Sequence, residues 1–294
     1  MGEQFEPGPS RRASALAGLL TLMVLTGSGY PTARADVPLK YVALGDSAAA
    51  GPLIPDAGTP WDCFKSTHNY PAVLAGALGA DLTDATCSGA EIPDLVDHGQ
   101  TVLVSVRPPQ IDAVSADTDL ITITIGGNDI GMVQLGARCA GMSLSGAGSC
   151  RDAFVHDGVD TISQRIDQLR PAYAHLIDRL RDAAPHARIV LVGYGTYLRP
   201  GGCFPTQPLV PDAADYIRAK GAELNSAAHE VATAHGIDFF DAEAATVGHD
   251  ICAAPGDRDF EGFLPTPDDL PAAPLHPTAA GMATIGSALS RMLR

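Results

Sequence analysis

Four short, largely apolar runs that are rich in β-branched residues constrain the fold of this chain more than any other feature. They cover residues 39–45, 120–126, 189–194 and 237–240. The first three are continuous rather than alternating in polarity, so each predicts a strand that is buried on both faces. Strands of this kind belong to parallel sheets whose two faces are covered by helices.

Segments with helical spacing alternate with these predicted strands. Helices are expected over residues 70–78, 162–180, 212–234 and 278–293, with Asn69 and Pro71 starting the first of them. Pro171 is expected to kink or restart the second helix. The alternation predicts an α/β fold, a three-layer α/β/α domain with a central, mostly parallel sheet. In such a domain, sites lie at the carboxyl ends of the strands.

The first 35 residues are typical of a secretory signal. Two arginines at positions 11 and 12 precede an apolar stretch over residues 13–27, and an Ala-Arg-Ala cleavage site follows at 33–35. The apolar stretch is shorter than the roughly 20 residues that span a membrane. We expect cleavage before Asp36, with an uncleaved anchor as the alternative. The remainder, residues 36–294, is then a single catalytic domain, secreted to the exterior or the cell envelope, without a stable membrane span.

The cysteine content fits an exported chain. Six cysteines follow the predicted signal, and an even number in an oxidising compartment predicts three disulfide bonds. Spacing alone supports only a local bond between Cys139 and Cys150. The sequence has no Cys-x-x-C motif, so neither a zinc site nor a redox site is expected. The six are Cys63, Cys87, Cys139, Cys150, Cys203 and Cys252.

The acidic composition limits the partners of the chain. The formal net charge is −15. Nucleic acids and anionic membranes are both bound through clusters of Lys and Arg. We therefore expect no nucleic-acid partner and no adsorption to anionic lipid by charge alone, and we expect a monomer.

Four residues in chain order match the needs of ester hydrolysis. Ser47 and Asn128 follow the first two strands of this set, Gly89 lies in a Cys-Ser-Gly-Ala segment, and His276 precedes the last helix. A serine hydroxyl is a poor nucleophile until a neighbouring imidazole takes its proton. The tetrahedral intermediate needs preorganised N–H donors, which the backbone of Ser47 and Gly89 and the Asn128 amide can supply. Asp46 and Asp129 are interpreted as turn-forming residues.

With these residues in order, the chain resembles the SGNH (GDSL) hydrolase superfamily. Segments 63–71, 87–89 and 248–252 are similar to its secreted actinobacterial esterase/lipase branch. The resemblance implies a flavodoxin-like fold, Ser47 and His276 as catalytic residues, an oxyanion hole from Ser47, Gly89 and Asn128, and no cofactor. It also implies the disulfide pairs Cys63–Cys87, Cys139–Cys150 and Cys203–Cys252.

One departure from the family pattern concerns the group that orients the histidine. Many members carry Asp three residues before the catalytic His, whereas this chain has Ala273 there. We expect a Ser–His dyad in which the Ala273 carbonyl, or a neighbouring one, accepts the Nδ1 proton of His276. Asp268 and Asp269 are alternative orienting groups.

The expected activity is that of a serine esterase or lipase acting on small-molecule or lipid esters. A phospholipase and a glycan acetylesterase use the same machinery, and the proline-rich loops favour an apolar acyl chain weakly. A catalytically silent module that binds lipid or glycan is the alternative outside enzymes. Trp61 is expected either to reach the cleft or to pack in a loop, and His249 is the one further histidine of interest.

Overall fold

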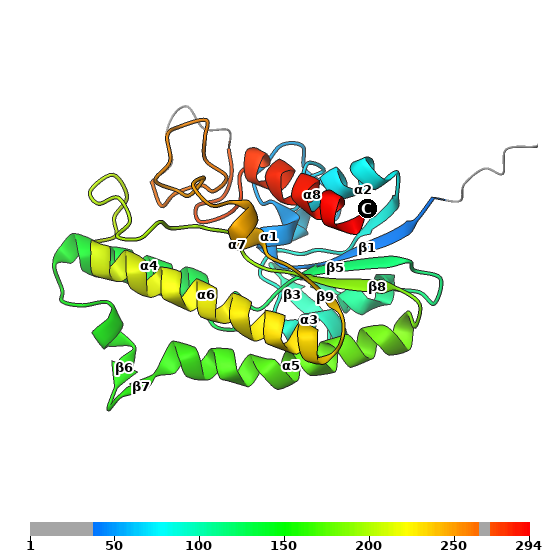
Figure 1. Ribbon diagram of the computed structural model, residues 1–294, viewed down its shortest axis with the longest axis horizontal. Helices are drawn as coiled ribbons and strands as arrows, with labels where there is room; N and C mark the ends of the chain where they lie inside the picture. The colour runs from blue at the N-terminus through cyan, green and yellow to red at the C-terminus, as the bar shows by residue number, and fades with distance from the viewer. Residues whose placement is uncertain (1–37, 265–270) are drawn as a thin grey trace, which may run out of the picture. The chain divides into compact units, whose positions relative to one another are not determined.

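A five-stranded parallel sheet lies at the centre of the structure, a computed structural model that describes residues 38–264 and 271–294 (Figure 1). The strand order is β2-β1-β5-β8-β9, and every neighbouring pair is parallel. The predicted signal segment, Asp268 and Asp269 lie outside the described residues. The strands are β1 (Lys40–Gly45), β2 (Asp81–Asp84), β5 (Leu120–Thr124), β8 (Arg188–Val192) and β9 (Asp238–Phe240).

Helices cover both faces of this sheet, so the prediction of a three-layer α/β/α fold is confirmed. Alternate residues of β1 belong to two separate cores, because side chains along a strand point to opposite faces. Tyr41 lies in the core with α2 and α8, and Val42 lies in the core with α5 and α6. One face carries α1 (Ser47–Ala50), α2 (Tyr70–Leu78), α7 (Ala242–Ala245) and α8 (Ala279–Leu293), and the other carries α3 (Ile92–Val96), α5 (Thr161–Ala183) and α6 (Pro211–Ala234).

Local capping signals account for the helix boundaries. The Asn69 side chain accepts from the N–H of Ala72 at the start of α2, and Gly79 ends this helix in the left-handed conformation. Thr278 caps α8 in the same way, through the N–H of Gly281. The helices begin and end within a few residues of the predicted positions.

Helix α5 runs through Pro171 without restarting there, contrary to one of the two outcomes expected. The loss of one backbone hydrogen bond at proline is offset by packing on both sides of it. The apolar stripe of α5 is buried from its first turn to its last: Ile162, Ile166, Leu169, Tyr173, Leu176, Ile177 and Leu180.

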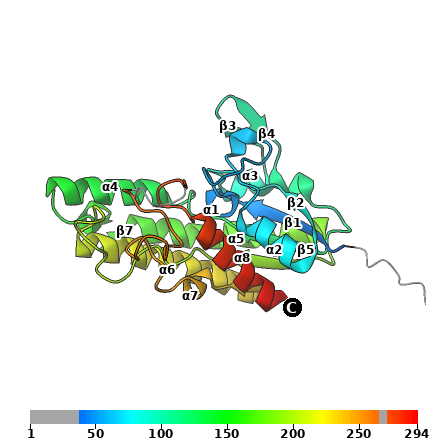
Figure 2. The same ribbon diagram turned by 90° about the horizontal axis from the view of Figure 1, so that it is seen from above.

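Several elements were not predicted. The edge strand β2 is short and half exposed, and α4 (Met132–Ser145) follows the turn after β5. The hairpin of β3 (Gln100–Val102) and β4 (Ser105–Arg107) projects from the domain in Figure 2. A second hairpin joins β6 (Val155–His156) to β7 (Val159–Asp160). Strands this short lack the length over which a periodic pattern becomes visible.

The cysteines pair as the family resemblance implies, in the bonds Cys63–Cys87, Cys139–Cys150 and Cys203–Cys252. The first joins the segment after α1 to the segment after β2. Among the helices of the described residues, none has the length and apolar character needed to cross a membrane.

Candidate active site

The nucleophile candidate Ser47 lies in a sharp turn between β1 and α1. Asp46 is the N-cap of α1, and its Oδ1 accepts from the N–H of Ala48 at 2.8 Å. Asp46 and Ala48 are buried, whereas Ser47 is partly exposed. The turn therefore presents the serine hydroxyl at the carboxyl edge of the sheet, where a substrate can reach it.

Gly45, the last residue of β1, lets this turn form. Its φ is +142°, and a Cβ there would lie 2.4 Å from the carbonyl oxygen of Thr124 on the neighbouring strand. The buried amide of Gln110 completes the turn, since its Oε1 accepts from the Gly45 N–H at 2.7 Å and its Nε2 donates to the Gly45 carbonyl at 3.0 Å. Gln110 is 65 residues away in sequence, and no sequence signal predicted its contact with Gly45.

His276 contacts both Ser47 and a backbone carbonyl. Its Nε2 lies 2.7 Å from Ser47 Oγ, and its Nδ1 lies 2.8 Å from the carbonyl oxygen of Pro274. A proton on Nδ1 that is donated to Pro274 leaves Nε2 free to accept the hydroxyl proton of Ser47. The orienting carbonyl is therefore the neighbouring one, that of Pro274, and not that of Ala273, which accepts the backbone N–H of His276 at 3.1 Å.

Burial sets the protonation state of this histidine. Removal from water lowers the pKa of His276 below its usual 6.5, and the bond to the Pro274 carbonyl opposes this only in part. The imidazole is therefore neutral near neutral pH and available as a proton acceptor.

The candidate oxyanion donors lie on three neighbouring turns. The Nδ2 of Asn128 donates to the carbonyl of Ala90 at 2.9 Å, which holds the amide and leaves its second hydrogen free. The N–H of Cys87 donates to the carbonyl of Gly45 at 3.0 Å, which places the turn containing Gly89 beside the nucleophile turn. Within residues 38–264 and 271–294, the N–H groups of Ser47 and Gly89 have no acceptor.

A partly buried tyrosine links two of these turns. The hydroxyl of Tyr194, which follows β8, accepts from the N–H of Gly127 at 2.7 Å and donates to Oδ2 of Asp46. Asp46 and Tyr194 are 148 residues apart in the chain, and no local pattern predicted this contact. Burial raises the pKa of Asp46 to about 7.

Asp129 holds a turn, as expected. Its Oδ1 accepts from the N–H of Ile92 at 3.0 Å, and burial raises the pKa of this carboxyl to about 6. Neither aspartate contacts the hydroxyl of Ser47 or the ring of His276 through a hydrogen bond between described residues. Both carboxyls therefore act through the backbone of the turns.

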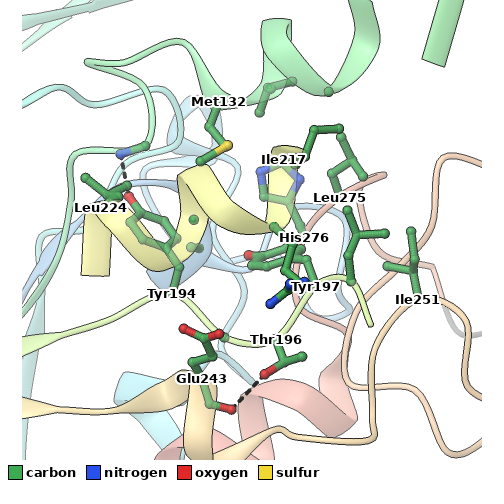
Figure 3. A pocket seen from close by; sticks show the side chains of 18 of the residues that line it. Met132, Tyr194, Thr196, Tyr197, Ile217, Leu224, Glu243, Ile251, Leu275 and His276 are labelled. Carbon is green, nitrogen blue, oxygen red and sulfur yellow. Dashed lines mark hydrogen bonds between the residues drawn. The ribbon is translucent and has the colours of Figure 1, made fainter. Parts of the chain in front are cut away.

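A pocket lined mainly by aliphatic and aromatic side chains opens beside Ser47, Asn128 and His276 (Figure 3). Its walls come from α4, α6 and the loops after β8 and before α8. Gly89, Trp61 and His249 do not line this pocket. Trp61 is 67% exposed, and Nδ1 of His249 lies 2.8 Å from the Asp257 carbonyl oxygen. Apolar lining residues include Met132, Ile217, Leu224, Phe263 and Leu275. In the described part of the chain, no cluster of three or more His, Cys, Asp or Glu side chains is placed to hold a metal.

The chain is similar in sequence and structure to known lipases and esterases. The model of the GDSL-like Lipase/Acylhydrolase family matches residues 43–284. "Lipase 2" of Streptomyces coelicolor is 36% identical over 277 residues, which cover 91% of this chain and 90% of that protein. The crystal structure of phospholipase A1 from Streptomyces albidoflavus covers 87% of this chain and 99% of its own, with a TM-score of 0.71 and 26% identity.

The match to the crystal structure of the extracellular lipase from Streptomyces rimosus covers 87% of this chain and 99% of the lipase chain, with a TM-score of 0.62 and 25% identity. The family match spans most of the described residues and includes Ser47, Gly89, Asn128 and His276. The chain belongs to the GDSL-like lipase/acylhydrolase family and is a carboxylic ester hydrolase.

Proposed function

We propose that Ser47 attacks the carbonyl carbon of the ester while His276 Nε2 takes the hydroxyl proton. The 2.7 Å contact between these two atoms is the observation that carries the proposal. His276 then protonates the leaving alcohol, and water hydrolyses the acyl-enzyme by the reverse proton transfers. The N–H groups of Ser47 and Gly89 and the free amide hydrogen of Asn128 stabilise the oxyanion, each worth roughly 3–4 kcal/mol where such donors have been removed.

The catalytic pair works as a dyad in this proposal. The Pro274 carbonyl, 2.8 Å from Nδ1, fixes the tautomer of His276 as a triad carboxylate does elsewhere. A neutral carbonyl stabilises the developing imidazolium less than a carboxylate. Asp268 and Asp269 are the rival orienting groups, and they are tested below.

The substrate is an ester with an apolar acyl chain, in a protein that is exported. The apolar lining of the pocket supports such a chain, and the relatives are named as lipases, a phospholipase A1 and an esterase. Three disulfide bonds support an oxidising compartment, together with the signal-like segment over residues 1–35. We propose a monomer with one catalytic domain over residues 36–294.

The test compares the mature wild type with four variants on p-nitrophenyl esters from two to sixteen carbons. Ser47→Ala and His276→Ala are expected to lose at least about 1000-fold in kcat. The double variant Asp268→Asn/Asp269→Asn is expected to keep most of the wild-type rate. The fourth variant, Ala273→Gly, serves as a control because it retains every backbone carbonyl.

A serine-directed fluorophosphonate separates a silent binding module from an enzyme. Labelling that disappears in Ser47→Ala supports an activated nucleophile. Absence of both labelling and Ser47-dependent turnover would reject the proposal. A loss of about 10⁴ in kcat for the Asp268/Asp269 double variant, the scale seen when a triad acid is replaced, would reject the dyad and leave the nucleophile in place.

A further inference from the structure

Gly221 lies inside the long helix α6, where the fold itself gives no reason for a glycine. Glycine is, after proline, the least favourable residue in a helix interior. Its backbone does not adopt the left-handed conformation, and a Cβ added there would have no atom within 4 Å. Neither backbone geometry nor close packing therefore requires the missing side chain.

The position faces the pocket beside Ser47. Gly221 lines that pocket together with Ile217, four residues before it, and Leu224, three residues after it. These three positions share one face of α6. Figure 3 shows Ile217 and Leu224 at the cavity, with Met132 of α4 also at its wall. The space that a side chain at 221 would fill is therefore part of the pocket.

A second helical glycine in the pocket wall shows a different arrangement. A Cβ on Gly136 of α4 would lie 3.2 Å from Leu275 Cδ1 and 3.3 Å from Phe263 Cζ, so this glycine allows close packing of the wall. At Gly221 the corresponding space is empty. Of the two glycines, only Gly221 leaves room for a ligand.

We propose that the absent side chain at Gly221 sets the acyl-chain length that this hydrolase accepts, by keeping the α6 side of the pocket open for the distal methylenes. This inference rests on the proposed function. The acyl group is the part of the substrate that becomes bonded to Ser47 in the first step and is released by water in the second, and the same pocket contains Ser47, Asn128 and His276. The aliphatic side chains of Ile217 and Leu224 beside Gly221 match a hydrocarbon chain, because buried methylenes gain free energy in proportion to the area removed from water.

The experiment uses Gly221→Leu and Gly221→Ala, with Gly141→Leu as the matched control. Gly141 also lies inside a helix with no atom near its added Cβ, but it is exposed and does not line the pocket. Each protein is assayed on p-nitrophenyl esters with 4, 8 and 12 acyl carbons. For Gly221→Leu, the ratio of kcat/KM for the longest to the shortest ester is expected to fall about tenfold or more, which corresponds to loss of contact for two or three methylenes.

For Gly221→Leu, kcat/KM on the four-carbon ester is expected to fall less than on the twelve-carbon ester, and Gly141→Leu, outside the pocket, should leave the ratio unchanged. Gly221→Ala should shift the ratio in the same direction by less. Because alanine favours the helix, the thermal midpoint of Gly221→Ala should not fall below that of the wild type. This variant therefore tests acyl-length preference even if Gly221→Leu does not fold.

An unchanged ratio in Gly221→Ala and in folded Gly221→Leu would overturn the inference. The inference would also be overturned if the Gly221 variants changed their preference among butyrate esters of different alcohols and kept the wild-type acyl preference. The α6 side of the pocket would then bind the alcohol part of the substrate. A wild type without Ser47-dependent turnover marks failure of the proposed function instead. Labelling rates with alkylphosphonate probes of increasing chain length give a second readout, in which Gly221→Leu slows only the long probes.

Discussion

At the scale of the residue, two contacts of His276 prepare it to act as a base. The Pro274 carbonyl accepts a hydrogen bond from Nδ1–H, and the Nε2 lone pair points at Ser47 Oγ, 2.7 Å away. Burial then disfavours the charged imidazolium. Tautomer and charge are thus set by two separate features, a hydrogen bond and the exclusion of water.

The lowered pKa of His276 predicts the acid limb of the pH profile. The neutral ring is the active form, so kcat/KM rises as pH passes through the pKa of the free enzyme. We expect a midpoint below 6.5, the usual histidine value. The measurement is kcat/KM between pH 4 and 9 on a soluble ester, with recovery of activity after return to pH 7 as the control for unfolding. A midpoint at or above 6.5 would contradict the assignment of burial as the dominant influence.

At the scale of the element, the site depends on the carboxyl ends of three adjacent strands. In the sheet, β1 pairs with β5 and β5 pairs with β8. The turn after β1 presents Ser47, the turn after β5 presents Asn128, and the segment after β8 carries Tyr194. The hydroxyl of Tyr194 joins the first two turns through Asp46 and Gly127.

Replacing Tyr194 by Phe is expected to weaken both stability and turnover. The N–H of Gly127 would lose its acceptor and Asp46 its donor, at a cost of about 1–3 kcal/mol in the free energy of unfolding. Loss of the link would also let the Asn128 turn shift, so kcat should fall roughly tenfold or more. Urea unfolding and steady-state kinetics measure the two effects.

Tyr197→Phe is the matched control for this prediction. Tyr197 lines the same pocket, but its hydroxyl has no hydrogen bond with any described residue. It should lose little stability and little activity. Equal effects of the two substitutions would show that the Tyr194 hydroxyl does not hold the turns together.

At the scale of the whole molecule, the buried carboxyl of Asp46 links stability to pH. Its pKa is about 7 in the folded protein against 3.8 for the ordinary side chain. The unfolded chain therefore releases this proton first, and the free energy of unfolding falls as pH rises from about 4 to about 7. Asp129, with a pKa of about 6, acts in the same sense, while the lowered pKa of His276 acts in the opposite one.

Asp46→Asn isolates the contribution of Asp46. Asparagine still caps a helix, but it does not titrate. We expect wild-type stability, relative to the variant, to decline as pH rises from about 4 to about 7. Urea unfolding at several pH values measures the difference, which should be largest above pH 7. Parallel stability curves for the two proteins would show that Asp46 does not titrate in this range.

The layered fold and the order of the candidate site residues could be predicted from local patterns in the chain. Continuous apolar runs indicate strands that are buried on both faces, and capping residues indicate helix ends. Both signals depend only on residues within a few positions of each other in the chain. The polar residues that follow those runs therefore stand at one edge of the sheet. Ser47, Asn128 and His276 all line one pocket there.

The contacts that hold those residues in place form only when the chain has folded. The Pro274 carbonyl accepts from Nδ1 of His276, whereas the Ala273 carbonyl accepts from the backbone N–H of the same residue. The contact of Tyr194 with Asp46 and the empty space at Gly221 likewise depend on elements far apart in the chain. Such contacts leave no periodic trace in sequence, since packing fixes them only after the elements have assembled.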